Sequence, residues 1–287
     1  MLQVARLAPT LLHEAADRVA DYLRSQFNSD GGVRDRSGAS DLYYTVFGLE
    51  GLAALQVGIP QDSAVEYLRS FSDGASLDLV HLACLARCWA SLPREALGEG
   101  DRRGILARLE HFRRADGAYA ADVDEEYGTA YHSFLAYGAH QDLGHEFPGS
   151  VPLRGFLEGL MTAPGGYANS KAVPVATTPT TAAVMTLQRH LGGVVSESAG
   201  PWLLGCVASE GGFLAAPSAP MPDLLSTATA LHALAGCEIS FEAIREPCLD
   251  FVDTLWTGQG FCGTWSDADP DAEYTYYGLL ALGHLSL

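Results

Sequence analysis

Lysine is nearly absent from this sequence, because Lys171 is the single lysine among 287 residues. The formal net charge is −18, since 35 acidic residues outnumber 17 basic ones, almost all of them arginine. A nucleic-acid binder needs a basic surface, and attraction to an anionic membrane needs clustered positive charge. The composition therefore argues against both functions and predicts no nucleic-acid partner.

Long hydrophobic runs are also missing. No stretch of about 18 apolar residues is present, as a transmembrane helix would require, and the first residues lack the basic start and apolar core of a signal peptide. The six cysteines fall mostly in apolar stretches such as LACLARCWA, which is typical of buried, reduced thiols. We therefore expect a cytoplasmic protein with no membrane-spanning segment and no disulfide framework.

One sequence pattern recurs along the chain: a glycine turn, an apolar or aromatic residue, a polar loop and then an apolar helix. Two clear copies are DGGVRDRSGASDLYYTVFGLEGLAAL and EGGFLAAPSAPMPDLLSTATALHAL, and SDGASLDLVHLACLARCWASL is a degenerate copy. The glycines that mark the copies stand 42 to 49 residues apart and are Gly32, Gly74, Gly117, Gly166, Gly212 and Gly260. Self-similarity at this period indicates a repeat architecture.

Each repeat predicts two helices of different character. The segment before the glycine, for example TLLHEAADRVADYLRSQF, has apolar residues at spacings of three and four, as an amphipathic outer helix requires. The segment after the loop is apolar on most sides, which indicates a buried inner helix. The last such segment, YTYYGLLALGHLSL, has no polar cap and needs the first repeat as its partner. Strand signals are scarce. We therefore predict an all-α closed ring of six outer and six inner helices, forming one domain over residues 1–287.

These repeats, of the form GG-Φ…loop…T/Y-x-x-A-L-x-x-L, resemble those of the prenyltransferase and squalene oxidocyclase superfamily, and the resemblance covers the whole chain. The segment Gln259–Trp265 also fits the Q-x-x-x-G-x-W repeat of squalene–hopene-type cyclases. The resemblance implies an α/α toroid that holds an isoprenoid chain at its apolar centre. It fixes the fold more closely than the chemistry, which has to be argued from the residues of the site.

A terpene cyclase is the leading functional hypothesis. Protonation-initiated cyclases of this superfamily carry an Asp-x-Asp-Asp motif, which Asp122-Val123-Asp124-Glu125 resembles, with glutamate in the last position. The resemblance gives the proton-donor role to Asp124, with Asp122 and Glu125 as neighbours that tune it. A desolvated carboxylic acid beside another carboxylate can stay protonated near neutral pH. Aromatic faces would stabilise the resulting carbocation, and we expect the substrate to be bound by Tyr43, Tyr44, Phe47, Tyr127, Tyr131, Asp223, Tyr274 and Tyr277.

The β-subunits of protein prenyltransferases offer an alternative. They bind zinc through an Asp-x-Cys and a histidine, and here Asp223 matches the aspartate, whereas Leu225 and Tyr274 occupy the other two positions. The loss of two ligands argues against a zinc site. A diphosphate substrate among so many carboxylates would require Mg²⁺. This alternative also implies a helical partner subunit.

The acidic residues also have a structural explanation that involves no catalysis. Acidic residues are common at helix N-termini for electrostatic reasons, and for Asp223 an N-cap of the fifth inner helix is the preferred interpretation. A third class of function is a non-catalytic isoprenoid carrier or partner-binding scaffold. Neither the chain length of the isoprenoid nor the product can be derived from the sequence.

Overall fold

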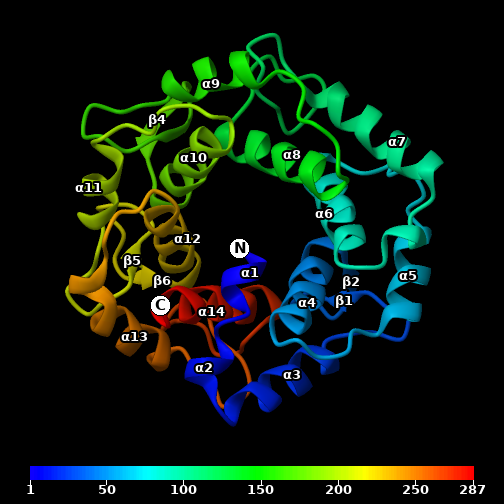
Figure 1. Cartoon of the computed structure of the whole chain (residues 1–287), viewed down its shortest axis with the longest axis horizontal. Coiled ribbons are helices and arrows are strands. Elements are labelled where there is room, and N and C mark those ends of the chain that lie inside the picture. The colour runs from blue at the N-terminus through cyan, green and yellow to red at the C-terminus, as the bar shows by residue number, and fades with distance from the viewer.

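Six inner helices form the wall of a ring in the computed structural model, which describes residues 1–287. Each inner helix packs against the next, and the last packs against the first, so that the wall returns to its start (Figure 1). The inner helices are α4 (Leu42–Ala54), α6 (Leu79–Ala90), α8 (Ala130–Asp142), α10 (Thr178–His190), α12 (Leu224–Gly236) and α14 (Ala272–Leu285). The predicted all-α toroid is confirmed.

Six shorter or more polar helices lie outside this wall (Figure 1). They bury one face against the inner helices and expose the other, as the apolar spacing predicts. The outer helices are α3 (Ala15–Ser25), α5 (Gln61–Arg69), α7 (Glu99–Leu109), α9 (Ser150–Glu158), α11 (Ala199–Leu204) and α13 (Arg245–Thr254). Short 3₁₀ turns accompany some of them at η1 (Arg94–Ala96), η2 (Glu110–Phe112) and η3 (Glu242–Ile244).

The loop from an outer helix to its inner helix folds into a small antiparallel hairpin in the first, fourth and fifth repeats. The paired strands are β1 (Val33–Arg34) with β2 (Ser40–Asp41), β3 (Ala168–Ser170) with β4 (Val173–Ala176), and β5 (Phe213–Leu214) with β6 (Pro222–Asp223). Each hairpin leads directly into the first residue of an inner helix or ends within two residues of it. All these starts lie at the same end of the ring, which we call the mouth.

Every inner helix begins with a side chain that accepts a hydrogen bond from a backbone N–H of its first turn. Ser, Thr, Asp and Asn are the residues that stabilise helix starts in this way. The caps are Asp41, Asp78, Thr129, Thr177, Asp223 and Asp271. Asp223, for example, accepts from the N–H of Ser226 at 2.7 Å, so the N-cap interpretation of this residue is confirmed.

A buried hydroxyl four residues after the cap ties each loop to its helix in five of the repeats. It accepts a hydrogen bond of 2.9 to 3.2 Å from a backbone N–H one residue after the repeat glycine, or two residues after it in the third repeat. The pairs are Val33–Thr45, Tyr119–Ser133, Tyr167–Thr181, Phe213–Thr227 and Phe261–Thr275. In the second repeat Leu82 takes the hydroxyl position, which explains why that copy reads as degenerate.

Replacing Thr227 with valine is expected to destabilise the protein by about 1–3 kcal/mol, because the buried N–H of Phe213 then loses its acceptor. The matched control is Thr229→Val on the same helix, whose hydroxyl donates to the carbonyls of Leu225 and Ser226 in the preceding turn and accepts from no backbone N–H of the loop. Urea denaturation of both variants measures the difference. Equal midpoints for the two variants would contradict a structural role for the Thr227 hydroxyl.

The N-terminal region differs from the predicted single outer helix. The expected helix is broken at His13, which has a φ of 48°, into α2 (Pro9–Leu12) and α3. A further short helix, α1 (Leu2–Ala5), lies inside the ring and contacts α4 and α14 (Figure 1). None of the helices combines the length and apolarity needed to cross a bilayer.

Candidate active site

The acidic segment that begins at Asp122 lies in an exposed loop before α8. Its carboxylates stabilise the loop itself: Asp122 accepts from the N–H of Asp124 at 3.2 Å, and Glu125 accepts from the N–H of Ala121 at 3.1 Å. Arg114 donates to the carbonyls of this segment. The predicted proton donor Asp124 therefore lacks the desolvation that its role requires, and the predicted neighbours Asp122 and Glu125 are exposed with it.

An aromatic cluster lies where the last inner helix meets the first. The ring centroids of Tyr43 and Phe47 are 5.0 Å apart, and Phe47 lies 5.5 Å from Tyr277 and 5.8 Å from Tyr276. Tyr44 adds an edge contact with Tyr43 at 5.7 Å. Tyr43 and Tyr277 are only half-buried although they belong to inner helices. Their rings therefore line space that solvent, or a ligand, can reach.

Glu273 extends this cluster to the first turn of α14. The hydroxyl of Tyr43 donates a hydrogen bond to Glu273 Oε1 at 2.5 Å. Burial raises the pKa of Glu273 to about 7, although the hydrogen bond from Tyr43 acts in the opposite direction. Burial and the neighbouring Tyr277 and Glu273 also raise the pKa of Tyr43. The pair is therefore a carboxylic acid that can hold its proton near neutral pH, beside a phenol that stays protonated.

The second carboxylate at this corner has a different environment. Asp271 Oδ2 accepts from Arg36 Nε at 3.0 Å and from Arg36 Nη2 at 2.8 Å. Arg36 also lies over the ring of Tyr274, with its guanidinium carbon 5.8 Å from the centroid. Asp271 thus has a cationic partner, whereas no ion pair involves Glu273. Glu273 and Asp271 are therefore neighbouring carboxyl groups with unlike surroundings.

The structure brings some predicted substrate-binding residues together and separates others. Tyr131 on α8 is 40% exposed, and the negative charge of Glu273 contributes to raising its pKa to about 12, after the larger effect of burial. Tyr131 in turn contributes to raising the pKa of Tyr43 and of Tyr277, which indicates that the three rings lie near one another. By contrast, Tyr127 is 65% exposed in the acidic loop and lies outside the cluster.

Two other predicted residues take structural positions beside the cluster. Asp223 caps α12, and burial raises its pKa while its bonds to Ser226 lower it. Tyr274 packs so closely over Gly263 that a side chain at that glycine would overlap its ring. The sequence places Glu273 at the mouth of the ring but gives it no catalytic role, although one signal points to it. Glu273 lies one helical turn before Tyr277 and so on the same face of α14.

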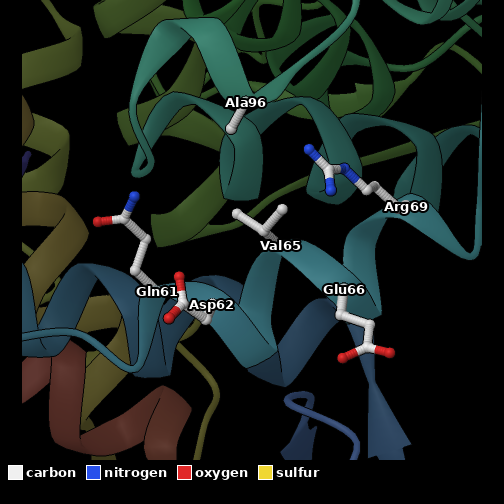
Figure 2. A pocket seen from close by; sticks show the side chains of 6 residues that line it. All are labelled: Gln61, Asp62, Val65, Glu66, Arg69 and Ala96. Carbon is white, nitrogen blue, oxygen red and sulfur yellow. The ribbon is translucent and has the colours of Figure 1, made fainter.

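No group of three or more His, Cys, Asp or Glu side chains comes close enough to hold a metal ion. One pocket lies among the outer elements of the ring. It has a volume of about 530 Å³ and lies between α5 and the turn η1, lined by Gln61, Asp62, Val65, Glu66, Arg69 and Ala96 (Figure 2). Its charged lining does not suit an apolar chain.

We compared the sequence with models of protein families and the fold with solved structures. The sequence model of the prenyltransferase alpha-alpha toroid domain matches residues 11–71 and 156–286, more than half of the chain. The structure resembles a variant of the type II terpene cyclase MstE from Scytonema in complex with geranylgeranyl dihydroxybenzoate, with a TM-score of 0.70 and 12% identity over 97% of each chain.

Two further structures have the same shape. Protein geranylgeranyltransferase-I from Candida albicans, complexed with GGPP, gives a TM-score of 0.69 at 14% identity, over 94% of this chain and 90% of the other. A protein from Actinoplanes gives 0.65 at 14% identity, over 95% and 98%. No curated relative matches at the level of sequence. At these identities the structures show a shared fold, and the family match shows membership: the chain belongs to the prenyltransferase alpha-alpha toroid domain family.

Proposed function

We propose that this protein binds an isoprenoid at the mouth of the ring and starts its cyclisation by protonating an alkene, with Glu273 as the acid. The observation that carries this proposal is the half-buried carboxyl of Glu273, bonded to Tyr43 and surrounded by tyrosine rings. A general acid works best when its pKa lies near the working pH, and the pKa of about 7 for Glu273 meets this condition.

The bond from Tyr43 occupies Glu273 Oε1, which leaves Oε2 to carry the acidic proton. The electron pair of the alkene forms a new C–H bond with this proton, the O–H bond breaks, and a carbocation forms on the neighbouring carbon. The Tyr43 hydroxyl then stabilises the carboxylate, while the faces of Tyr43, Tyr131 and Tyr277 stabilise the cation. A second alkene of the chain then gives its electron pair to the cation and closes the ring. The new cation loses a proton to water, and the carboxylate of Glu273 takes up a proton from solvent for the next turnover.

The comparisons support the class of substrate. The similar terpene cyclase structure holds a geranylgeranyl compound and the similar transferase holds GGPP, so both toroids carry isoprenoids. A transferase mechanism has less support in this chain. Asp223 is engaged as an N-cap, and Leu225 and Tyr274 supply neither a thiolate nor an imidazole to a zinc ion.

Product analysis by gas chromatography–mass spectrometry tests the proposed function. Purified protein is incubated with geranyl, farnesyl and geranylgeranyl diphosphates and with squalene, each with and without Mg²⁺. The expected result is a cyclic product from at least one of them, with Mg²⁺ required only if the diphosphate itself must be neutralised for binding. Recovery of all four substrates unchanged would contradict the cyclase proposal and favour a carrier or scaffold.

A further inference from the structure

The short helix α1 lies within the ring (Figure 1). It lies away from the mouth, because its Val4 contacts Gly283 in the last turn of α14. It contacts α14 and α4, the two helices that carry Glu273 and Tyr43. Its backbone lies directly against α14 near the C-terminal end of that helix, because a Cβ atom added at Gly283 would overlap the carbonyl oxygen of Val4. The buried Ala5 anchors the helix against the core.

The first residue lies close to the axis of the ring. Burial lowers the pKa of the Met1 amino group, and this group interacts electrostatically with side chains from five of the six inner helices. Those side chains are Glu50 on α4, Arg87 on α6, Arg189 on α10, His232 on α12 and His284 on α14. In agreement with these interactions, the N-terminus is marked inside the ring of inner helices in Figure 1.

The distance between α1 and the proposed acid follows from helix geometry. Glu273 lies in the first turn of α14 and Gly283 in the last, which corresponds to about 15 Å at 1.5 Å per residue. Met1, Leu2 and Val4 are partly buried against the core. An isoprenoid chain that enters at the mouth and passes Tyr277 would therefore reach α1 about 15 Å from Glu273 along α14.

We infer that α1 is the floor of the isoprenoid site and sets the longest prenyl chain that the ring accepts. This inference rests on the proposed function, because it concerns the same space. The rest of the wall is built from inner helices that pack on one another and on outer helices. By contrast, α1 is held chiefly by contacts with α4 and α14, so it can be removed or displaced without cutting the wall.

Two variants test the floor. One lacks residues 1–7, and the other is Gly283→Ala, in which the new methyl group must displace α1 from α14. The matched control is Gly138→Ala on inner helix α8, where an added Cβ meets nothing within 4 Å. Calorimetric titration measures the affinities for farnesyl and geranylgeranyl diphosphates, after circular dichroism has established that each variant is folded.

We expect both variants to shift the ratio of the two affinities towards geranylgeranyl diphosphate by tenfold or more, with the ratio unchanged in Gly138→Ala. An unchanged ratio in a folded variant would overturn the floor assignment while leaving the proposed function intact. If wild-type protein bound neither diphosphate nor squalene, the proposed function itself would fail, and the floor with it. Gly283→Ala keeps the full chain, so the test does not depend on the truncated protein being stable.

Discussion

Replacing Glu273 with glutamine is expected to lower the rate of cyclisation by about a hundred- to ten-thousand-fold, the range that a positioned general acid contributes. Glutamine keeps the shape of the side chain and can still accept the hydrogen bond from Tyr43, but it has no acidic proton to give. Substrate affinity should change little, because the contacts of the aromatic cluster remain. Turnover and binding are measured separately, by product quantification and by calorimetric titration.

The matched control for this variant is Asp124→Asn, which also converts an acid into its amide. Asp124 is exposed in the loop before α8, so its loss should leave turnover close to that of the wild type. The opposite pattern, with Asp124→Asn inactive and Glu273→Gln active, would show that the loop closes over the substrate and that the motif Asp122–Glu125 supplies the acid. The pair of variants therefore decides between the two assignments.

The pH profile provides a second criterion for the same acid. Protonation requires the neutral form of Glu273, which predominates below its pKa of about 7. Activity should therefore fall as the pH rises through about 7. The raised pKa also affects stability: the folded state holds this proton more tightly than the unfolded chain, so stability declines as the pH rises from the ordinary range of a glutamate through about 7. Glu273→Gln should remove this part of the decline.

The repeated features of this fold could be predicted from the sequence because they are local. Alternation of amphipathic and apolar segments gives outer and inner helices, and an aspartate or threonine before each apolar segment gives its cap, as at Asp223. The hydroxyl at Thr227 and its equivalents also recurs at a fixed distance from the cap.

The site was harder to predict, because burial depends on which helices meet in space. Asp124 lies in an acidic segment before an inner helix, and Glu273 lies in an acidic first turn of another. Glu273 is half-buried because α14 closes the ring against α4 and brings Tyr43 to its carboxyl, across 230 positions of sequence. Asp124 has no such partner. The position of α1 likewise depends on contacts with both ends of the chain, and its four residues carry no periodic signal.

Replacing Arg87 with methionine is expected to destabilise the fold by about 3–5 kcal/mol, the typical effect of removing one partner of a buried ion pair. Arg87 Nε and Nη2 each donate to a different oxygen of Glu50 at 2.5 Å. The side chains of Arg87 and Glu50 are only 26% and 9% exposed. The guanidinium also lies 5.8 Å from the ring centroid of Phe47. Without Arg87, the carboxylate of Glu50 would remain buried with no cation bonded to it.

The comparison variants separate charge from packing. Arg24→Met removes a cation from an exposed pair with Asp21, whose side chains are 45% and 79% exposed, and should cost less than about 1 kcal/mol. The double variant Arg87→Met with Glu50→Leu removes both buried charges and should recover most of the loss. Urea denaturation midpoints rank the three. If Arg87→Met alone unfolded at the wild-type midpoint, the ion pair would contribute no net stability to the fold, because the carboxylate of Glu50 would have to be hydrated in the variant.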